Sequence, residues 1–204
     1  MVVMLRQPVT STVTMSSTVP AEIRFWASRF DRVHVDFGTG NGAHAIALGR
    51  KDPGLAVIGV DTCLDHIEGS VRRRPGNVRF VTLDALAWPL GLLPVADAVT
   101  VNFPYGSLLR GLVEGNPALI ERLDNVLGQG CRFAVRVNAS ALLAAGFDHE
   151  SGSSQNVRTL DRIGGLRVAC RQMTQAELRA FPSSWSKRLG YGKKTTARLI
   201  TAVR

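Results

Sequence analysis

The 204-residue chain contains no apolar run close to the roughly 20 residues that a membrane-spanning helix needs. Its first 19 residues include Arg6 but lack a compact apolar core followed by a small-residue cleavage site, so we expect no secretory signal peptide.

Cysteine and histidine are also scarce. The three cysteines (Cys63, Cys131 and Cys170) are odd in number, far apart, and do not form a C-x-x-C motif. Such cysteines predict reduced, partly buried thiols in a protein of the cytoplasm, and not a disulfide or zinc framework. The four histidines show no metal-ligand spacing, so we expect no metal site.

Acidic residues are too few to balance the basic ones. Asp and Glu number 16 against 25 Lys and Arg, which gives a formal net charge of +9. This balance favours a polyanionic partner, most simply nucleic acid. Otherwise the composition is that of a globular protein, and we expect residues 1–204 to form one α/β domain.

Residues 33–42, V-H-V-D-F-G-T-G-N-G, are the stretch around which the chain is organised. The β-branched residues predict a buried parallel strand that ends at Asp36. Gly38, Gly40 and Gly42 can adopt backbone angles closed to other residues, so the chain can approach a ligand closely. A helical pattern follows at once. This predicts a nucleotide-type binding corner at the carboxyl end of a strand.

Two ligand classes use such a corner. Gly38-x-Gly40-x-x-Ala43 fits the loose dinucleotide fingerprint, which places a pyrophosphate on the helix N-terminus. Asp36 would repel a phosphate and instead suits a cationic ligand with an amino-acid end, such as S-adenosylmethionine. A plain tight turn capped by Asp36 is the third possibility, and we rank the methyl donor first.

Polar residues also stand at the tips of the next two predicted strands. Asp61 follows the second strand and is placed to hydrogen-bond a ribose, in a dinucleotide and in S-adenosylmethionine alike. Asp84 and Ala85 follow the third strand and could meet an adenine amino group. Leu86 or Trp88 could pack on that ring, although Trp88 fits the core better.

The fourth predicted strand leads into N-F-P-Y-G-S, residues 102–107. Because ligands bind beyond the carboxyl ends of strands in an open α/β sheet, we expect Asn102 and Ser107 over the donor. Pro104 would stiffen this turn. Tyr105 could present a flat face to a planar substrate, or could pack on the following helix.

The whole pattern predicts a doubly wound, mostly parallel sheet of seven strands that ends in an antiparallel hairpin. That is the Rossmann-like architecture of S-adenosylmethionine-dependent methyltransferases. Residues 1–19 are expected to form a loose arm or a short hairpin, and residues 148–158 a polar loop. The strands are expected at residues 33–36, 56–60, 78–83, 97–103, 131–137, 166–172 and 197–203.

An insertion at residues 173–194 separates the last two strands and begins with a capping box at Thr174 and Glu177. Its second half, residues 181–194, interleaves aromatic and basic side chains, which suits an unstacked base with its flanking phosphates. The alternative is a core tryptophan with solvated lysines. The residues concerned are Trp185, Lys187, Arg188, Tyr191, Lys193 and Lys194.

A second basic run stands far from this segment in the sequence. It consists of Arg72, Arg73 and Arg74, and it is either a phosphate contact or a solvated helix end.

Three stretches carry a family resemblance: D-R-V-H-V-D-F-G-T-G-N-G (31–42), F-P-Y-G-S-L-L-R-G (103–111) and S-S-W-S-K-R-L-G-Y-G-K-K (183–194). They resemble the aminoglycoside-resistance 16S rRNA methyltransferases of the Kam/Npm type, which modify N1 of adenine-1408. The resemblance extends over most of the chain from Phe30 onward. It implies a donor pocket at Asp36, Gly38, Asp61, Asp84, Ala85 and Pro104, with Ser107 and Ser183 close to the donor.

The resemblance also implies that a flipped adenine is held between Tyr105 and Trp185. The implied substrate is 16S rRNA within the assembled 30S subunit, and we expect a monomeric enzyme. This chain departs from the family pattern at Tyr105, where relatives carry tryptophan. It also departs at Asn41, Leu86 and Thr195, where they carry aspartate, glutamate and arginine.

N1 of adenine is neutral at pH 7 and has a lone pair, so no general base is needed to create the nucleophile. The remaining work is base extrusion and in-line alignment with the sulfonium methyl group. Three alternatives stay open: a methyltransferase acting on another RNA base, for example in tRNA; a NAD(P)-dependent oxidoreductase; and a non-catalytic RNA-binding protein.

Overall fold

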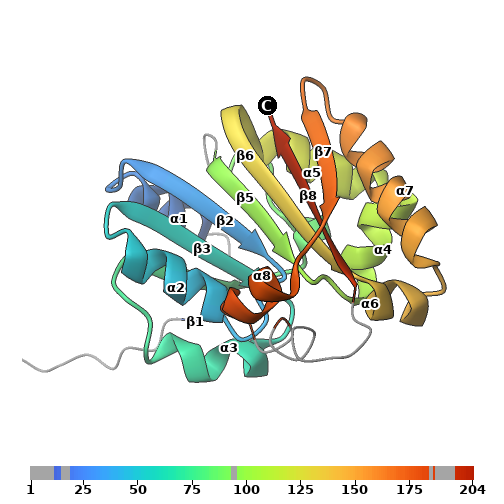
Figure 1. Ribbon diagram of the computed structural model, residues 1–204. Helices are drawn as coiled ribbons and strands as arrows, with labels where there is room; N and C mark the ends of the chain where they lie inside the picture. Colours follow the sequence, from blue (N-terminus) through green and yellow to red (C-terminus); the bar gives the residue numbers. More distant parts are fainter. Residues whose placement is uncertain (1–11, 15–18, 93–95, 184–185, 187–195) are drawn as a thin grey trace, which may run out of the picture.

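A computed structural model describes residues 12–14, 19–92, 96–183, 186 and 196–204. The described strands are β1 (Thr12–Thr14), β2 (Arg32–Phe37), β3 (Leu55–Asp61), β4 (Val78–Thr82), β5 (Ala96–Asn102), β6 (Leu127–Asn138), β7 (Arg167–Gln172) and β8 (Ala197–Val203). They form one eight-stranded sheet in the order β1-β4-β3-β2-β5-β6-β8-β7. Figure 1 shows β3 beside β2, and β5, β6, β8 and β7 in the other half of this sheet.

The seven predicted strands are all present, and β8 is antiparallel to both β6 and β7, as expected for the terminal hairpin. The predicted loose arm or short hairpin at residues 1–19 is wrong for the part that the structure describes. Thr12–Thr14 pairs in parallel with β4 instead of forming a local hairpin. This pairing joins segments more than 60 residues apart, so no local pattern in residues 1–19 could indicate it.

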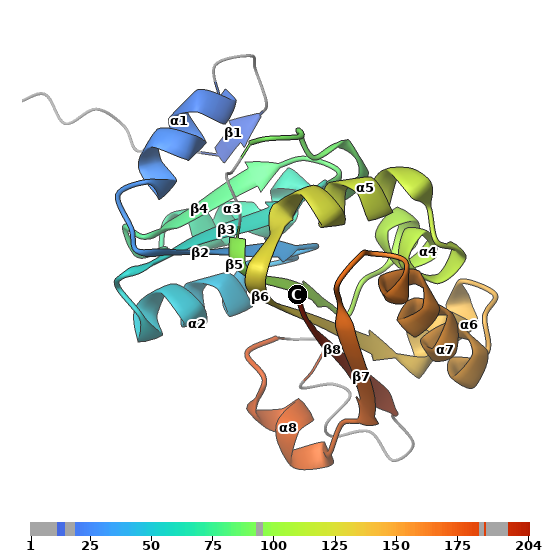
Figure 2. The ribbon, with the colours of Figure 1, turned by 90° about the horizontal axis from the view of Figure 1, so that it is seen from above.

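Helices cover both faces of the sheet. They are α1 (Val19–Ala27), α2 (Ala43–Lys51), α3 (Leu64–Val71), α4 (Gly106–Glu114), α5 (Pro117–Val126), α6 (Ala139–Ala144), α7 (His149–Asp161) and α8 (Gln175–Ala180), with a short 3-10 turn, η1, at Ala85–Ala87. Figure 2 shows α1, α4 and α5 on one side of the sheet and α2 and α8 on the other. None of the helices in the described ranges combines the length and apolarity that crossing a membrane requires.

The predicted polar loop at residues 148–158 is wrong, because these residues belong to α7. Asp148 caps this helix by accepting hydrogen bonds from the backbone N–H groups of Glu150 and Ser151. The buried side of α7 is lined by small or polar residues such as Ser153 and Asn156, so the apolar period that marks a helix is missing. The helix is stabilised by its cap and by close packing.

Two apolar cores hold the layers together. The larger core lies between the sheet and the helices α1, α4, α5, α6 and α7. The smaller core lies between the sheet and the helices α2 and α3. Trp88 is 1% exposed in the larger core and packs edge-on against Phe37, so the expectation of a core tryptophan is confirmed. A third, small cluster of Phe103, Met173, Leu178, Phe181 and Ala197 joins α8 to the carboxyl end of β5.

Candidate functional site

A cavity of about 530 Å³ opens at the carboxyl ends of β2, β3, β4 and β5. Its remaining wall comes from the chain that follows α8. Ten of the twelve residues expected at the donor or at the clamped base line this cavity: Gly38, Gly40, Asp61, Asp84, Ala85, Asn102, Pro104, Tyr105, Ser107 and Ser183. Neither Leu86 nor Trp88 lines it, and Leu83 is the leucine that does.

The glycine turn adopts the conformation that its sequence predicts. Gly38, Gly40 and Gly42 have φ angles of 69°, 55° and 70°, in the left-handed region that favours glycine. A Cβ atom on Gly42 would lie 2.5 Å from the ring of Phe80, so this position also requires glycine for close packing. The turn can therefore present its backbone directly to the cavity.

Asp36 does not line the cavity, because its carboxylate is 1% exposed and lies below the floor. Its Oδ2 accepts a hydrogen bond from Thr39 Oγ1 (2.8 Å), and its Oδ1 accepts from Thr100 Oγ1 (2.6 Å) and Asn102 Nδ2 (2.8 Å). Thr39 and Asn102 do line the cavity. Asp36 thus positions the residues that line the cavity, and its negative charge lies beneath them.

Asp61 connects the glycine turn to the start of α3. Its Oδ2 accepts a hydrogen bond from the Gly40 N–H (2.8 Å), and its Oδ1 accepts from the Cys63 N–H (3.0 Å). Since a carboxylate offers about four lone-pair sites, Asp61 retains the capacity to accept ligand hydroxyls. Asp84 caps η1 through the Leu86 N–H (2.9 Å) and keeps its second oxygen for other partners.

The turn after β5 carries a strained residue. Phe103 has φ 52°, the one positive φ of a non-glycine residue within the described ranges. Backbone strain of this kind is concentrated at functional sites. Two residues further on, Tyr105 lies at the cavity with 67% of its surface exposed, which leaves its ring free to stack on a planar group.

The wall after α8 begins with Phe181, Pro182 and Ser183. Trp185, Lys187, Arg188, Lys193 and Lys194 lie outside the described residues. Arg72, Arg73 and Arg74 follow α3 at the opposite end of the sheet from the cavity, with Arg72 and Arg73 exposed and Arg74 partly buried.

Two histidines near the cavity have lowered pKa values. The Thr100 hydroxyl donates its proton to Asp36, so it accepts the hydrogen bond from His34 Nε2, which fixes the tautomer of His34. Burial lowers the pKa of His34 to about 4, against the raising effect of Asp36. Burial also lowers the pKa of His44, which lines the cavity.

Sequence reasoning missed His44, Thr39 and Phe181 among the residues that line the cavity. Thr39 lies within the glycine turn and His44 lies just after it, so their closeness to this motif in the sequence could have indicated that they line the cavity. Phe181 opens the basic and aromatic segment. Its role depends on contacts with distant elements that local sequence does not encode.

The sheet order β4-β3-β2-β5-β6-β8-β7 and a glycine-turn cavity bordered by acids from successive strand tips define a Rossmann-like S-adenosylmethionine-dependent methyltransferase. The family described as NpmA, 16S rRNA (adenine(1408)-N(1))-methyltransferase, matches residues 12–204. The chain belongs to this family and is a methyltransferase.

Individual relatives agree with this assignment. A 16S rRNA (adenine(1408)-N(1))-methyltransferase from Escherichia coli is 26% identical over 203 residues, covering 91% of each chain. Another from Streptoalloteichus hindustanus is 27% identical, covering 83% of this chain and 85% of its own. A tryptophan-to-alanine mutant of the Catenulisporales acidiphilia enzyme, solved with its cosubstrate S-adenosylmethionine, superposes with a TM-score of 0.75 at 26% identity and 90% coverage of both chains.

Proposed function

We propose that this enzyme transfers the methyl group of S-adenosylmethionine to N1 of adenine-1408 in 16S rRNA, acting on the assembled 30S subunit. The observation that carries the proposal is the cavity, in which the glycine turn, two acids and an exposed aromatic ring converge. We further propose that the chain acts in the cytoplasm as a monomeric, single-domain enzyme that confers aminoglycoside resistance.

The cavity has the groups that the methyl donor needs. Asp61 is the candidate partner of the ribose hydroxyls, and Asp84 with the backbone of Ala85 is the candidate partner of the adenine amino group. The glycine turn and Asn102 border the end that would hold the amino acid and the sulfonium. The buried charge of Asp36 favours a cationic ligand there and disfavours the pyrophosphate of a dinucleotide.

The methyl transfer itself needs alignment more than acid–base chemistry. The N1 lone pair attacks the methyl carbon, the carbon–sulfur bond breaks, and the sulfonium becomes a neutral thioether while the adenine gains the positive charge. Two aromatic faces, Tyr105 and Trp185, would stack on the extruded base and stabilise this charge by a cation–π interaction of about 0.5–2 kcal/mol. The high exposure of Tyr105 at the cavity supports its part in this clamp.

Two groups of basic residues are proposed to bind rRNA phosphates. The first, which follows Ser183 in the sequence, is Lys187, Arg188, Lys193 and Lys194, and the second, which follows α3, is Arg72, Arg73 and Arg74. Arg73 donates from Nε to the carbonyl of Gly69 (3.2 Å), and Arg79 donates to the carbonyl of Gly76 (3.3 Å). Neither forms an ion pair with a carboxylate among the residues that the structure describes. Arg79 is also close enough to Arg74 and Arg29 for these charges to lower its pKa, after the larger effect of burial. A polyanion would neutralise this cluster.

The test is methyl transfer from labelled S-adenosylmethionine to purified 30S subunits, with primer extension to locate the label. Methylation at N1 blocks base pairing, so a reverse-transcription stop at adenine-1408 is expected. Label at another position would refute the proposed target while leaving a methyltransferase. No label on 30S subunits, together with label on tRNA, would favour the alternative RNA substrate.

Trp185→Ala is expected to abolish measurable turnover and to change donor affinity by less than about twofold, because the clamp acts on the base and not on the donor. Isothermal titration calorimetry with the donor and single-turnover methylation separate the two effects. An equal loss of donor binding would rule out the clamp role for Trp185. Trp88→Phe, in the core, is the tryptophan control for nonspecific damage.

A further inference from the structure

Phe181 follows α8, and its ring contacts residues of α2, of β6 and of the turn after β5. The ring of His44, on α2, stacks on it with centroids 4.7 Å apart and planes 25° apart. The guanidinium carbon of Arg136, on β6, lies 4.5 Å from the ring centroid, and Phe103 contacts the ring edge-on at 5.8 Å. Phe181 is only 9% exposed, so these contacts hold it in one place.

Arg136 has a second role at the cavity floor. Its Nη1 donates a hydrogen bond to Asn102 Oδ1 (2.7 Å), while Asn102 Nδ2 donates to Asp36 Oδ1 (2.8 Å). A cation therefore faces the oxygen of the Asn102 amide and an anion faces its nitrogen, which fixes the orientation of this side chain. The N–H of Phe103 also donates to the carbonyl of Arg136 (2.8 Å).

Arg136 does not line the cavity, yet its side chain contacts two residues that do, Asn102 and Phe181. The wall continues from Phe181 to Ser183, whose N–H donates to the Phe181 carbonyl (2.8 Å). Ser186 is held in turn by its Oγ, which donates to the Leu178 carbonyl (2.6 Å) in a buried position. The ring contacts of Phe181 therefore hold the start of the short segment that leads to Ser183.

We propose that Arg136 is a positioning residue for methyl transfer, because it holds Asn102 in the floor of the cavity and, through Phe181, the wall that ends at Ser183. This inference rests on the proposed function, in which both residues border the methyl donor. Since a misplacement of about 1 Å can cost about 100-fold in rate, a loosened wall should reduce turnover more than donor affinity.

The experiment compares Arg136→Met, Phe181→Leu and their combination in the full-length enzyme. Each single variant is expected to lower kcat on 30S subunits about tenfold, with the donor Kd raised no more than about threefold. The double variant should lose no more than about a further twofold, because both changes interrupt the same path. Arg136→Lys keeps the charge and an N–H donor but not the planar stack, so it should recover part of the rate.

Arg132→Met is the matched control. Arg132 lies four residues earlier on β6, on the same face of the strand, and is exposed. It should leave kcat and donor Kd unchanged. Fully multiplicative losses in the double variant, or an unchanged kcat in Arg136→Met, would overturn the proposal.

Hydrogen–deuterium exchange separates this inference from the proposed function. In the absence of RNA, exchange over residues 178–183 should accelerate in Arg136→Met and Phe181→Leu and not in Arg132→Met. If wild-type enzyme places no label on 30S subunits, the proposed function fails, and the exchange data still test the role of Arg136. Unaltered exchange in both variants would refute that role.

Discussion

At the scale of single residues, the carboxylate of Asp36 accepts three side-chain hydrogen bonds at the tip of β2. Two of the donors, Thr39 and Asn102, line the cavity, and the third, Thr100, leads to His34. A buried carboxylate that is satisfied in this way holds its neighbours in fixed orientations, because leaving any one donor unpaired is costly. The acid at this strand tip therefore acts on a ligand through the residues above it.

The neutral state of His34 predicts a pH-dependent stability. Its pKa is about 4 in the folded protein and about 6.5 in the unfolded chain, so the unfolded state binds more protons between these values. The free energy of unfolding should therefore fall as the pH drops from about 6.5 to about 4, by up to about 1.4 kcal/mol per pH unit for one proton.

His34→Gln keeps an N–H donor for Thr100 but does not titrate. Urea unfolding between pH 4 and pH 7 should show a shallower slope for this variant than for the wild type. His44, whose pKa is also lowered, should account for part of the remaining slope. An identical slope in both proteins would contradict the assignment to His34.

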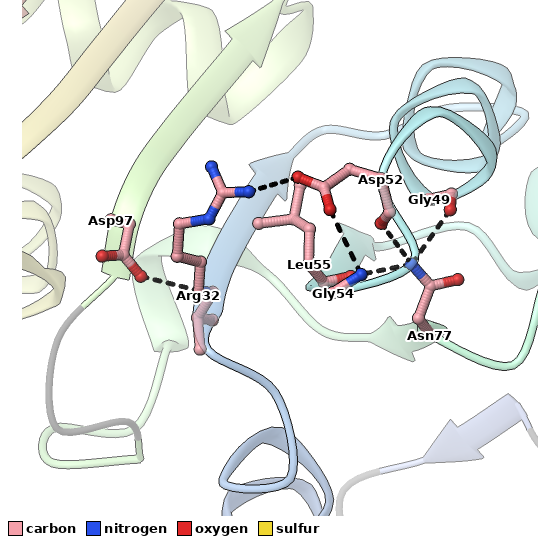
Figure 3. A network of polar contacts seen from close by, with 8 residues as sticks. Arg32, Gly49, Asp52, Gly54, Leu55, Asn77 and Asp97 are labelled. Carbon is pink, nitrogen blue, oxygen red and sulfur yellow. Dashed lines mark hydrogen bonds and ion pairs between the residues drawn. The ribbon is translucent and has the colours of Figure 1, made fainter.

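At the scale of elements, the side chain of Asn77 connects α2, β3 and the segment before β4, at the end of the sheet opposite the cavity. Its Nδ2 donates to the carbonyls of Gly49 (3.0 Å), Asp52 (2.9 Å) and Leu55 (2.8 Å), as Figure 3 shows. These contacts connect the end of α2, the start of β3 and the approach to β4. Asn77 is 7% exposed, so water cannot easily replace it.

Asn77→Ala should lower the free energy of unfolding by roughly 2–4 kcal/mol, because it leaves buried carbonyls without donors. Donor affinity should not change, since the network is remote from the cavity. Arg32→Ala is the control from the same network: its ion pair with Asp52 is exposed and should contribute only about 0–1 kcal/mol. Urea unfolding measures both, and equal effects would contradict this assignment.

At the scale of the whole molecule, the net charge of +9 should appear as a steep salt dependence of 30S binding. Replacing Arg72 and Arg73 together by alanine should reduce the slope of log K against log[salt] by roughly 1.4–1.8, if each binds one phosphate. The control is a double alanine variant of Arg158 and Arg167, which are also exposed. Equal slopes in both double variants would indicate a diffuse charge effect and contradict a phosphate site at Arg72 and Arg73.

The sequence by itself determined seven of the eight described strands and most of the residues that line the cavity. Strand-forming runs that end in an acid or amide at Asp36, Asp61 and Asn102 indicated the strands and their order along the chain. The glycine turn requires left-handed backbone, which almost no other residue adopts at low cost. Because the carboxyl ends of parallel strands meet at one edge, these local signals were enough to bring the cavity residues together.

Only the tertiary structure decided the remaining features, because they depend on contacts between segments far apart in sequence. The parallel pairing of β1 with β4, the burial of the polar face of α7, and the place of Asp36 beneath the cavity floor are of this kind. The same holds for Arg136, whose contacts with Asn102 and Phe181 form when β5, β6 and the chain after α8 assemble. A local pattern records the preferences of a segment, whereas burial and side-chain partners are set by what packs against it.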